Sequence, residues 1–343
     1  MPAESQAASG RVGARIAFFG SGSLLSRELR AALEQRAFPT ADVRLYDEAG
    51  PGALSEFDGE ALVVTRPDEE SILGLDIAFL CGTRSEMTPY LDWGSRRGFT
   101  AIDLSGAAAA RAGVPLIHTE LNPGSISPPL IASPHPLAHN LATVVSVARG
   151  VAPVGSLRAL AFRPVSELGS AAIDELYQQT VGLLSFSEVP HEILDRQIAF
   201  NLVPSRGMQG NFGPDYDERA IAETSRLLDL PAERVGLTSA LVPVFHGHTM
   251  QVTLRFDARP DVGDLEAAFE SARGTLLVRE LSDFSPVDLA GEERVAVADM
   301  RPDASDPCTV TLWSFCDNLK GGTALNAIRI AERVADRVQG AGQ

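Results

Sequence analysis

A short apolar run followed by two closely spaced glycines does most to limit how this sequence can fold. Residues 15–19 are mostly apolar, Gly20 and Gly22 follow at once, and apolar side chains recur at helical spacing through residues 24–35. This order predicts a strand, a tight turn and a helix. Further short strands are predicted at 43–46, 77–81, 100–103 and 130–132. Short strands that alternate with helical segments indicate an α/β unit of Rossmann type with a parallel sheet.

The pattern changes after Pro134, where longer segments with alternating apolar and polar residues begin. Alternation over this length predicts a second, mostly antiparallel sheet. The segments are 157–165, 238–245, 249–256, 275–278, 294–299 and 308–316. Helical spacing recurs at 171–183, 217–228 and 324–338. The length of 343 residues suits two domains, an α/β domain and an α+β domain.

Charge and cysteine content narrow the class of partner. The chain has 45 acidic and 29 basic side chains, a net charge of −16, and such a surface repels nucleic acid and anionic membranes. Lys320 is the only lysine. Cys81, Cys308 and Cys316 are too few for a disulfide framework and are interpreted as core residues, which indicates a reducing compartment. We therefore predict a soluble cytoplasmic protein, with a disordered tail at residues 1–13.

The glycine turn departs from the dinucleotide-binding pattern. Gly20 and Gly22 occupy the first two glycine positions, but Leu25 stands where the third belongs. Asp47, at the end of the second predicted strand, could accept a hydrogen bond from a ribose hydroxyl and would repel a 2′-phosphate. A retained site would therefore favour NAD over NADP. The alternative is a turn inherited from a nucleotide-binding ancestor that now binds nothing.

Four stretches together resemble the aspartate-semialdehyde dehydrogenase family, in the family's order and at roughly its spacing. They are 171–176, 197–201, 242–248 and 317–326. The resemblance runs from about residue 14 to 336 and implies a dinucleotide-binding-like domain of residues 14–133 with 322–343. It also implies a dimerisation domain of residues 134–321, a homodimer and an ancestry in amino-acid biosynthesis.

The same resemblance implies thiol chemistry whose residues are missing here. The family's catalytic cysteine falls on Pro136, which has no nucleophile. Its glutamine falls on Arg163, and the arginines that grip substrate and phosphate fall on Leu241 and Ala109. The catalytic histidine is retained as His248. In lacking the cysteine, the chain is most similar to the Usg-type relatives.

Some positions that the resemblance connects with the cofactor are kept. The family's glycine pattern falls on Gly20, Ser23 and Ser26, while Asn318 and Asn326 match. With Gly22 and Asp47, these residues are the expected surroundings of a dinucleotide. A basic group is also retained at Arg219.

Four of the six histidines fall on two segments that meet at the family's active site. His135 and His139 are four residues apart, on one face of a helix that begins near Pro136. His246 and His248 are two apart, on one face of a strand. Convergence would suit zinc or a similar divalent metal. The alternative is that His139 is buried, His246 is exposed and His248 is simply inherited, with no metal.

Two functional hypotheses follow. The first is a non-catalytic homologue, a dimeric scaffold or regulatory binding protein whose partner is another protein or a small anion held by Arg163 and Arg206. The second is an NAD(P)-dependent oxidoreductase with thiol-independent chemistry, by either direct hydride transfer or a reaction assisted by a metal at the histidines.

Overall fold

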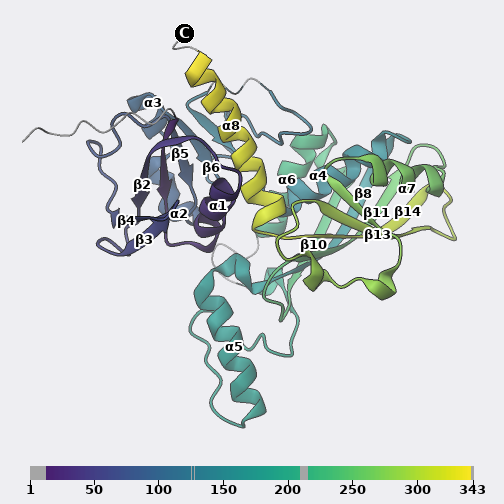
Figure 1. Cartoon of the computed structure of the whole chain (residues 1–343). Coiled ribbons are helices and arrows are strands. Elements are labelled where there is room, and N and C mark those ends of the chain that lie inside the picture. The colour runs from purple at the N-terminus through teal and green to yellow at the C-terminus, as the bar shows by residue number, and fades with distance from the viewer. Residues whose placement is uncertain (1–12, 125, 127, 209–214, 341–343) are drawn as a thin grey trace, which may run out of the picture.

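Two seven-stranded sheets form the protein (Figure 1). The computed structural model describes residues 13–124, 126, 128–208 and 215–340. The predicted tail, apart from Gly13, and residues 341–343 lie outside these ranges. The domain boundaries given above stay a prediction. No helix in the described ranges is long and apolar enough to cross a membrane.

The first sheet has the order β3-β4-β2-β1-β5-β6-β7 and is parallel except where β3 pairs with β4. Its central strand β1 is buried on both faces, with Phe18 in one apolar cluster and Phe19 in the other. This burial explains the continuous apolar run. The strands are β1 Ala14–Phe19, β2 Thr40–Tyr46, β3 Leu54–Phe57, β4 Glu60–Thr65, β5 Ile77–Leu80, β6 Thr100–Asp103 and β7 Leu130–Ala132.

Helices cover both faces of this sheet. On one face α1 (Leu24–Gln35) and α8 (Leu325–Gly340) pack side by side, and α8 runs between the two sheets (Figure 1). Ser23 caps α1 by accepting a hydrogen bond from the backbone of Ser26. The short helix α2 (Arg84–Met87) follows the carboxyl end of β5. The short helix α3 (Trp93–Arg97) precedes the amino end of β6.

The predicted strands of this sheet are confirmed, but β3 and β4 were not predicted. They form an antiparallel hairpin at the sheet edge through the turn at Asp58 and Gly59. An Asp-Gly pair is a hairpin signal. Most side chains of both strands are exposed, so the apolar pattern is weak and the turn was the only usable signal.

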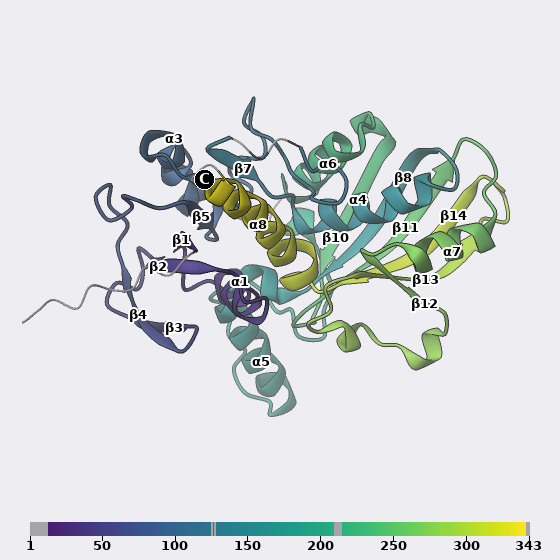
Figure 2. The same cartoon turned by 45° about the horizontal axis from the view of Figure 1, so that its top comes forward.

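The second sheet has the order β12-β13-β14-β11-β8-β10-β9 and is mostly antiparallel, as predicted. Only β8–β10 and β12–β13 are parallel pairs. Its strands are β8 Val154–Arg163, β9 Val203–Pro204, β10 Val235–Leu241, β11 His248–Phe256, β12 Thr275–Val278, β13 Val295–Pro302 and β14 Thr309–Cys316. Its helices α4 (Pro136–Arg149), α6 (Asp215–Leu228) and α7 (Val262–Ser271) bury one face (Figure 2).

The predicted strand 238–245 is too long. β10 ends at Leu241, and residues 242–247 form a turn before β11 begins at His248. Pro243 has no N–H for a ladder hydrogen bond, and Gly247 has a φ of 89°, so the chain reverses here. The alternation argument that put His246 and His248 on one strand face is therefore wrong. His248 is fully buried and His246 is exposed.

One helix stands apart from both layers. The helix α5 (Ser170–Leu184) projects away from the body of the molecule (Figure 1). The helix and the segment after it expose large apolar side chains, namely Tyr177, Val181, Leu184, Phe186, Ile193, Phe200 and Leu202.

Candidate functional site

A cleft of about 300 Å³ lies where the two sheets meet. The glycine turn contributes Ser23, and the start of α4 contributes His135 and Pro136. The turn after β8 contributes Ser166 and Glu167. The remaining wall includes Cys81, Thr83, Arg84, Tyr216, Arg219, Asn318 and Thr323. The cleft thus joins the predicted nucleotide region to the predicted acyl-transfer region.

Glu167 organises the second-sheet side of the cleft. Its Oε2 accepts a hydrogen bond from Arg163 Nε at 2.7 Å. Its Oε1 accepts from His248 Nε2 at 2.6 Å and also from the Tyr216 hydroxyl. The Arg163 guanidinium lies 3.3 Å from the centre of the Tyr216 ring. Arg163 and His248 are 0% exposed. The Glu167 carboxylate and the Arg163 guanidinium are therefore paired away from water.

The electrostatics hold the imidazole of His248 in its charged form. Burial lowers the pKa of His248, but the neighbouring Glu167 carboxylate outweighs burial and raises it to about 9. Burial likewise raises the pKa of Glu167, but Arg163 and His248 together bring it well below its ordinary range. A protonated histidine bonded to an ionised carboxylate is a poor proton acceptor near neutral pH.

Pro136 starts α4 at the cleft wall, as the sequence predicted. The preceding His135 caps the helix, because its Nδ1 accepts from the backbone of Leu137 at 3.2 Å. The His135 backbone donates to Glu223 Oε2 at 2.5 Å, and its ring packs edge-on against Tyr216. Burial lowers the pKa of His135 well below its ordinary value. This corner therefore offers a neutral imidazole and no thiol.

Two arginines face the cleft from its open side. Arg84 Nη1 pairs with Asp215 Oδ2 at 3.0 Å, whereas Arg219 Nε is 4.0 Å from the same oxygen and has no hydrogen-bond partner among the described residues. Burial, and then the nearby Arg84, lower the pKa of Arg219. Two guanidiniums that share one exposed carboxylate leave this part of the cleft able to take an anion.

The glycine turn borders a second space of about 500 Å³, which shares Ser23, Gly82 and Glu86 with the cleft. The Gly22 N–H donates to Asp47 Oδ2 at 2.9 Å, and the amides of Ser21 and Ser23 are bonded to backbone carbonyls.

The small size of Gly20 is also used within the chain, since a Cβ there would lie 2.7 Å from the Gly82 nitrogen. A pyrophosphate would therefore have to rely on the amides at the start of α1.

Comparison with known proteins agrees with this arrangement. The family described as semialdehyde dehydrogenase, dimerisation domain, matches residues 148–320. The USG-1 protein homolog of Azotobacter vinelandii is 30% identical over 92% of this chain and 96% of its own length. The chain belongs to the semialdehyde dehydrogenase family.

Within the semialdehyde dehydrogenase family, both enzymes and USG-1 homologues are similar to the chain. The aspartate-semialdehyde dehydrogenase of Rickettsia bellii is 29% identical, over 93% of this chain and 97% of its own. The crystal structure of aspartate semialdehyde dehydrogenase II complexed with ASA from Vibrio cholerae superposes with a TM-score of 0.86 at 26% identity. That match covers 93% of this chain and 97% of the other.

Among the predicted cofactor residues of this family member, the structure separates the two asparagines. Asn318 lines the cleft, and its Oδ1 accepts from the Gly247 amide at 2.9 Å. Asn326 does not line it: its side chain accepts from Thr119 and donates to the Ile117 carbonyl and Ser133 Oγ. These four hydrogen bonds lie within the core, and a role for Asn326 in cofactor binding stays a prediction.

The resemblance matches two arginines of the family to Leu241 and Ala109, and these two positions have different surroundings. Leu241 is buried in an apolar cluster with Val165, and Ala109 is buried beneath the first sheet. Arg111, two residues later, pairs with Asp92 at 2.9 Å on the surface and does not line the cleft.

The anion hypothesis named the wrong arginines. Arg163 is engaged by Glu167, and Arg206 pairs with Glu218 at 3.2 Å where both side chains are exposed. The structure places Arg84 and Arg219 at the cleft instead.

The four predicted metal ligands do not converge. The His139 ring stacks on His118 at 4.1 Å, His135 packs on Tyr216, and His246 lies exposed on its turn. Among the described residues, no three His, Cys, Asp or Glu side chains gather as a metal site would require. The four-histidine hypothesis is therefore wrong in its geometry, because Gly247 and the cap at His135 turn the rings apart.

Sequence reasoning missed Glu167, Tyr216 and Arg84. Glu167 follows a predicted strand by only a few residues, and nothing in its local sequence marks it as buried. The available signal was Arg163, because an arginine within a buried strand requires a carboxylate partner nearby.

Proposed function

We propose that this chain is a non-catalytic, Usg-like homologue of aspartate-semialdehyde dehydrogenase that acts as a dimeric binding protein, in a scaffold or regulatory role. The observation that carries the proposal is the Glu167 cluster, in which one buried carboxylate binds both Arg163 and His248. Acylating chemistry needs a thiol and a histidine free to exchange a proton. The resemblance puts Pro136, which lines the cleft, at the thiol position, and the retained His248 is bonded to Glu167.

The ligand of the cleft would be a small anion. Arg219 and Arg84 supply positive charge, and Ser166 and Asn318 supply neutral polar groups on the same walls. A carboxylate or phosphate at Arg219 would give the unbonded Nε a partner. We assign binding, without turnover, to this part of the cleft.

A homodimer would cover apolar surface that the single chain exposes. The family match to a dimerisation domain supports it, and so do the exposed side chains of α5 and its following segment, such as Leu184 at 69% and Phe186 at 97%. Light scattering at micromolar concentration should give the mass of two chains, and a monomer would contradict this part of the proposal. The three free cysteines agree with a cytoplasmic location.

Activity of the purified protein tests the central claim. With aspartate semialdehyde, phosphate and NADP, we expect no formation of NADPH above the rate without protein. Pro136→Cys should remain inactive, because Glu167 still holds His248 and Leu241 cannot grip a carboxylate. Pro136→Ala is the matched control for loss of the ring. Turnover by the unmodified protein would disprove the proposal.

The second candidate is an NAD(P)-dependent oxidoreductase with thiol-independent chemistry. It is favoured by one observation, the open space of about 500 Å³ beside Gly22 and Asp47. Asp47 and Glu48 line that space, so their carboxylates should favour NAD over NADP. Thermal unfolding with each dinucleotide tests it, because a ligand at about 100 times its Kd adds about 2.7 kcal/mol to the free energy of unfolding. No shift with either would remove this candidate.

A further inference from the structure

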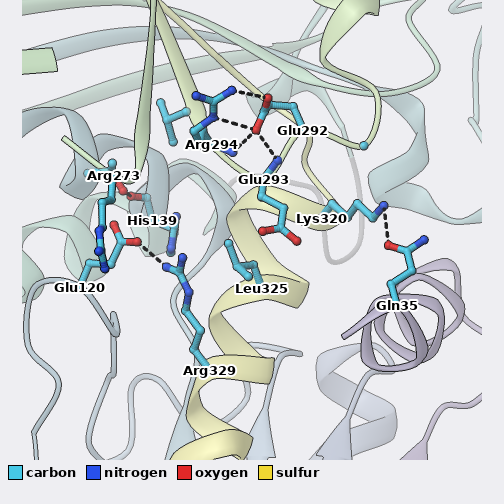
Figure 3. A pocket seen from close by; sticks show the side chains of 15 residues that line it. Gln35, Glu120, His139, Arg273, Glu292, Glu293, Arg294, Lys320, Leu325 and Arg329 are labelled. Atoms are coloured by element: carbon cyan, nitrogen blue, oxygen red, sulfur yellow. Dashed lines mark hydrogen bonds and ion pairs between the residues drawn. The ribbon is translucent and has the colours of Figure 1, made fainter. Parts of the chain in front are cut away.

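Another cavity, called the second cavity below, shares no lining residue with the cleft or with the space beside the glycine turn (Figure 3). Its volume is about 440 Å³, within the range of small-molecule sites. Helix α1, helix α4, the turn before β12 and the start of α8 all contribute walls. The charged or titratable side chains of these walls are Glu120, His139, Arg273, Glu292, Glu293, Arg294, Lys320 and Arg329.

Each glutamate of this cavity already has a cationic partner. Glu120 pairs with Arg329, and Glu292 binds Arg294 through two hydrogen bonds at 2.9 and 3.0 Å. Glu293 pairs with Arg36, which lies outside the cavity, at 3.3 Å. The carboxylates are therefore neutralised locally, although the whole chain carries a net charge of −16.

Two cations remain without a carboxylate. Among the described residues, neither Arg273 nor Lys320 has an acidic partner within 4.0 Å, and Lys320 Nζ makes only a long contact, 3.5 Å, to Gln35 Oε1. Figure 3 shows both side chains at the cavity, on opposite sides of Glu293 and Leu325. Lys320, the one lysine of the sequence, thus has no role in the cleft.

A buried imidazole completes the wall. His139 is 9% exposed and lines the cavity, and its buried Nδ1 has no hydrogen-bond partner in the part of the chain that the structure describes. Its ring lies next to the Arg329 guanidinium in Figure 3 and stacks on His118 on the other side. Burial, then His118 and Arg329, lower the pKa of His139 well below its ordinary value, so the ring is neutral and one nitrogen can donate. The wall of this cavity therefore contains a neutral imidazole together with two cations, Arg273 and Lys320, that have no acidic partner among the described residues.

We propose that this second cavity binds a small organic molecule with a doubly charged oxyanion group, a dicarboxylate or a phosphate monoester, through Arg273, Lys320 and the wall formed by His139 and Arg329. The apolar side chain of Leu325 and the cavity volume leave room for a carbon skeleton as well as the charged group. The site is independent of the cleft, so it does not depend on the proposed function.

Calorimetric titration of the full chain with succinate and, separately, glycerol phosphate tests the site at constant ionic strength. We expect saturable binding of at least one probe, weakened by at least about tenfold in Arg273→Gln/Lys320→Gln, since two charge-assisted contacts are lost. Arg66→Gln/Arg259→Gln removes the same charge from exposed positions that do not line the cavity and should leave the affinity unchanged. Because the cleft is proposed to take the same class of anion, Arg219→Gln should remove only binding in the cleft and leave the binding that depends on Arg273 and Lys320.

Imidazole NMR provides a second reading that does not require a variant to fold. The probe should shift the ring resonances of His139 and leave those of exposed His191 in place. The two probes distinguish the sources of the oxyanion, and binding of either supports the site. The proposal is overturned if neither binds at about 10 mM, if Arg273→Gln/Lys320→Gln binds as well as the unmodified chain, or if Arg219→Gln abolishes binding.

Discussion

The polar groups at one end of the cleft bind one another, whereas those at the other end border an open space. At the second-sheet end, Glu167, Arg163, His248 and Tyr216 satisfy one another and leave little for a ligand. At the first-sheet end, Asp47 engages the glycine turn, but the space beside it stays open. In the proposed function, internal pairing removes a reactive centre while a binding surface remains at the other end of the cleft.

The largest effect on stability is expected at the second-sheet end of the cleft, where Glu167 binds Arg163 and His248. Glu167→Gln keeps the shape but leaves Arg163 and His248 buried without their carboxylate, so the free energy of unfolding should fall by about 3–5 kcal/mol. Denaturant unfolding measures it. Glu218→Gln breaks the exposed pair with Arg206 and should cost under about 0.5 kcal/mol. Equal effects of the two variants would mean that the buried cluster contributes no more than a surface pair.

The second effect is a pH dependence of stability. The pKa of His248 is raised from 6.5 to about 9, so its stabilisation is complete below pH 6.5 and is lost as the pH rises through 9. The loss should reach up to about 3 kcal/mol between pH 7 and 10. The pKa of Glu167 is lowered, so its contribution is present above pH 4.5 and falls in acid. His248→Gln should flatten the alkaline limb, and an unchanged limb would assign it to other groups.

A smaller effect on stability is expected at the first-sheet end of the cleft, where Asp47 binds the glycine turn. Asp47→Asn removes a carboxylate that accepts from the Gly22 amide, which should cost about 1 kcal/mol of stability. If the turn binds dinucleotides, the same change should reduce the preference for NAD over NADP by about tenfold, since one repulsive charge near the 2′-phosphate is gone. Titration of both dinucleotides measures the ratio, with Asp42→Asn as the control. A preference that stays fixed would remove Asp47 from the recognition of ribose.

The smallest effect concerns a position that sequence reasoning placed near a phosphate. Arg111 pairs with Asp92, and both side chains are about half exposed, so Arg111→Gln should change the free energy of unfolding by under about 0.5 kcal/mol. Anion binding in the cleft should be unaffected. A loss of binding would show that Arg111 reaches the cleft when a ligand is present.

Strands and helices with strong apolar patterns were predictable, because burial itself produces the pattern. β1, α1 and α8 are examples, and each lies within one or two residues of its prediction. The polar hairpin β3–β4 was not, because its side chains are largely exposed. The start of α4 at Pro136 could be predicted from the sequence, because the first position of a helix needs no N–H.

The site was less predictable because it depends on contacts between distant segments. Glu167 and Tyr216 are 49 residues apart, and only the fold brings them together around Arg163. The prediction that His246 and His248 share one face of a strand was wrong for a local reason. Gly247 has a positive φ and separates His246 from β11. Asn326 matched a family position, but its four hydrogen bonds within the core give it a structural task.

The turn before α8 is a shared wall between the two cavities. Asn318, Leu319 and Thr323 line the cleft, whereas Lys320 and Gly321 line the second cavity. An insertion or deletion within residues 318–323 would shift residues of both walls, because neighbouring positions of the turn line different cavities. A change in the length of this turn is therefore expected to alter the two cavities together, whereas a single side-chain substitution can alter one of them.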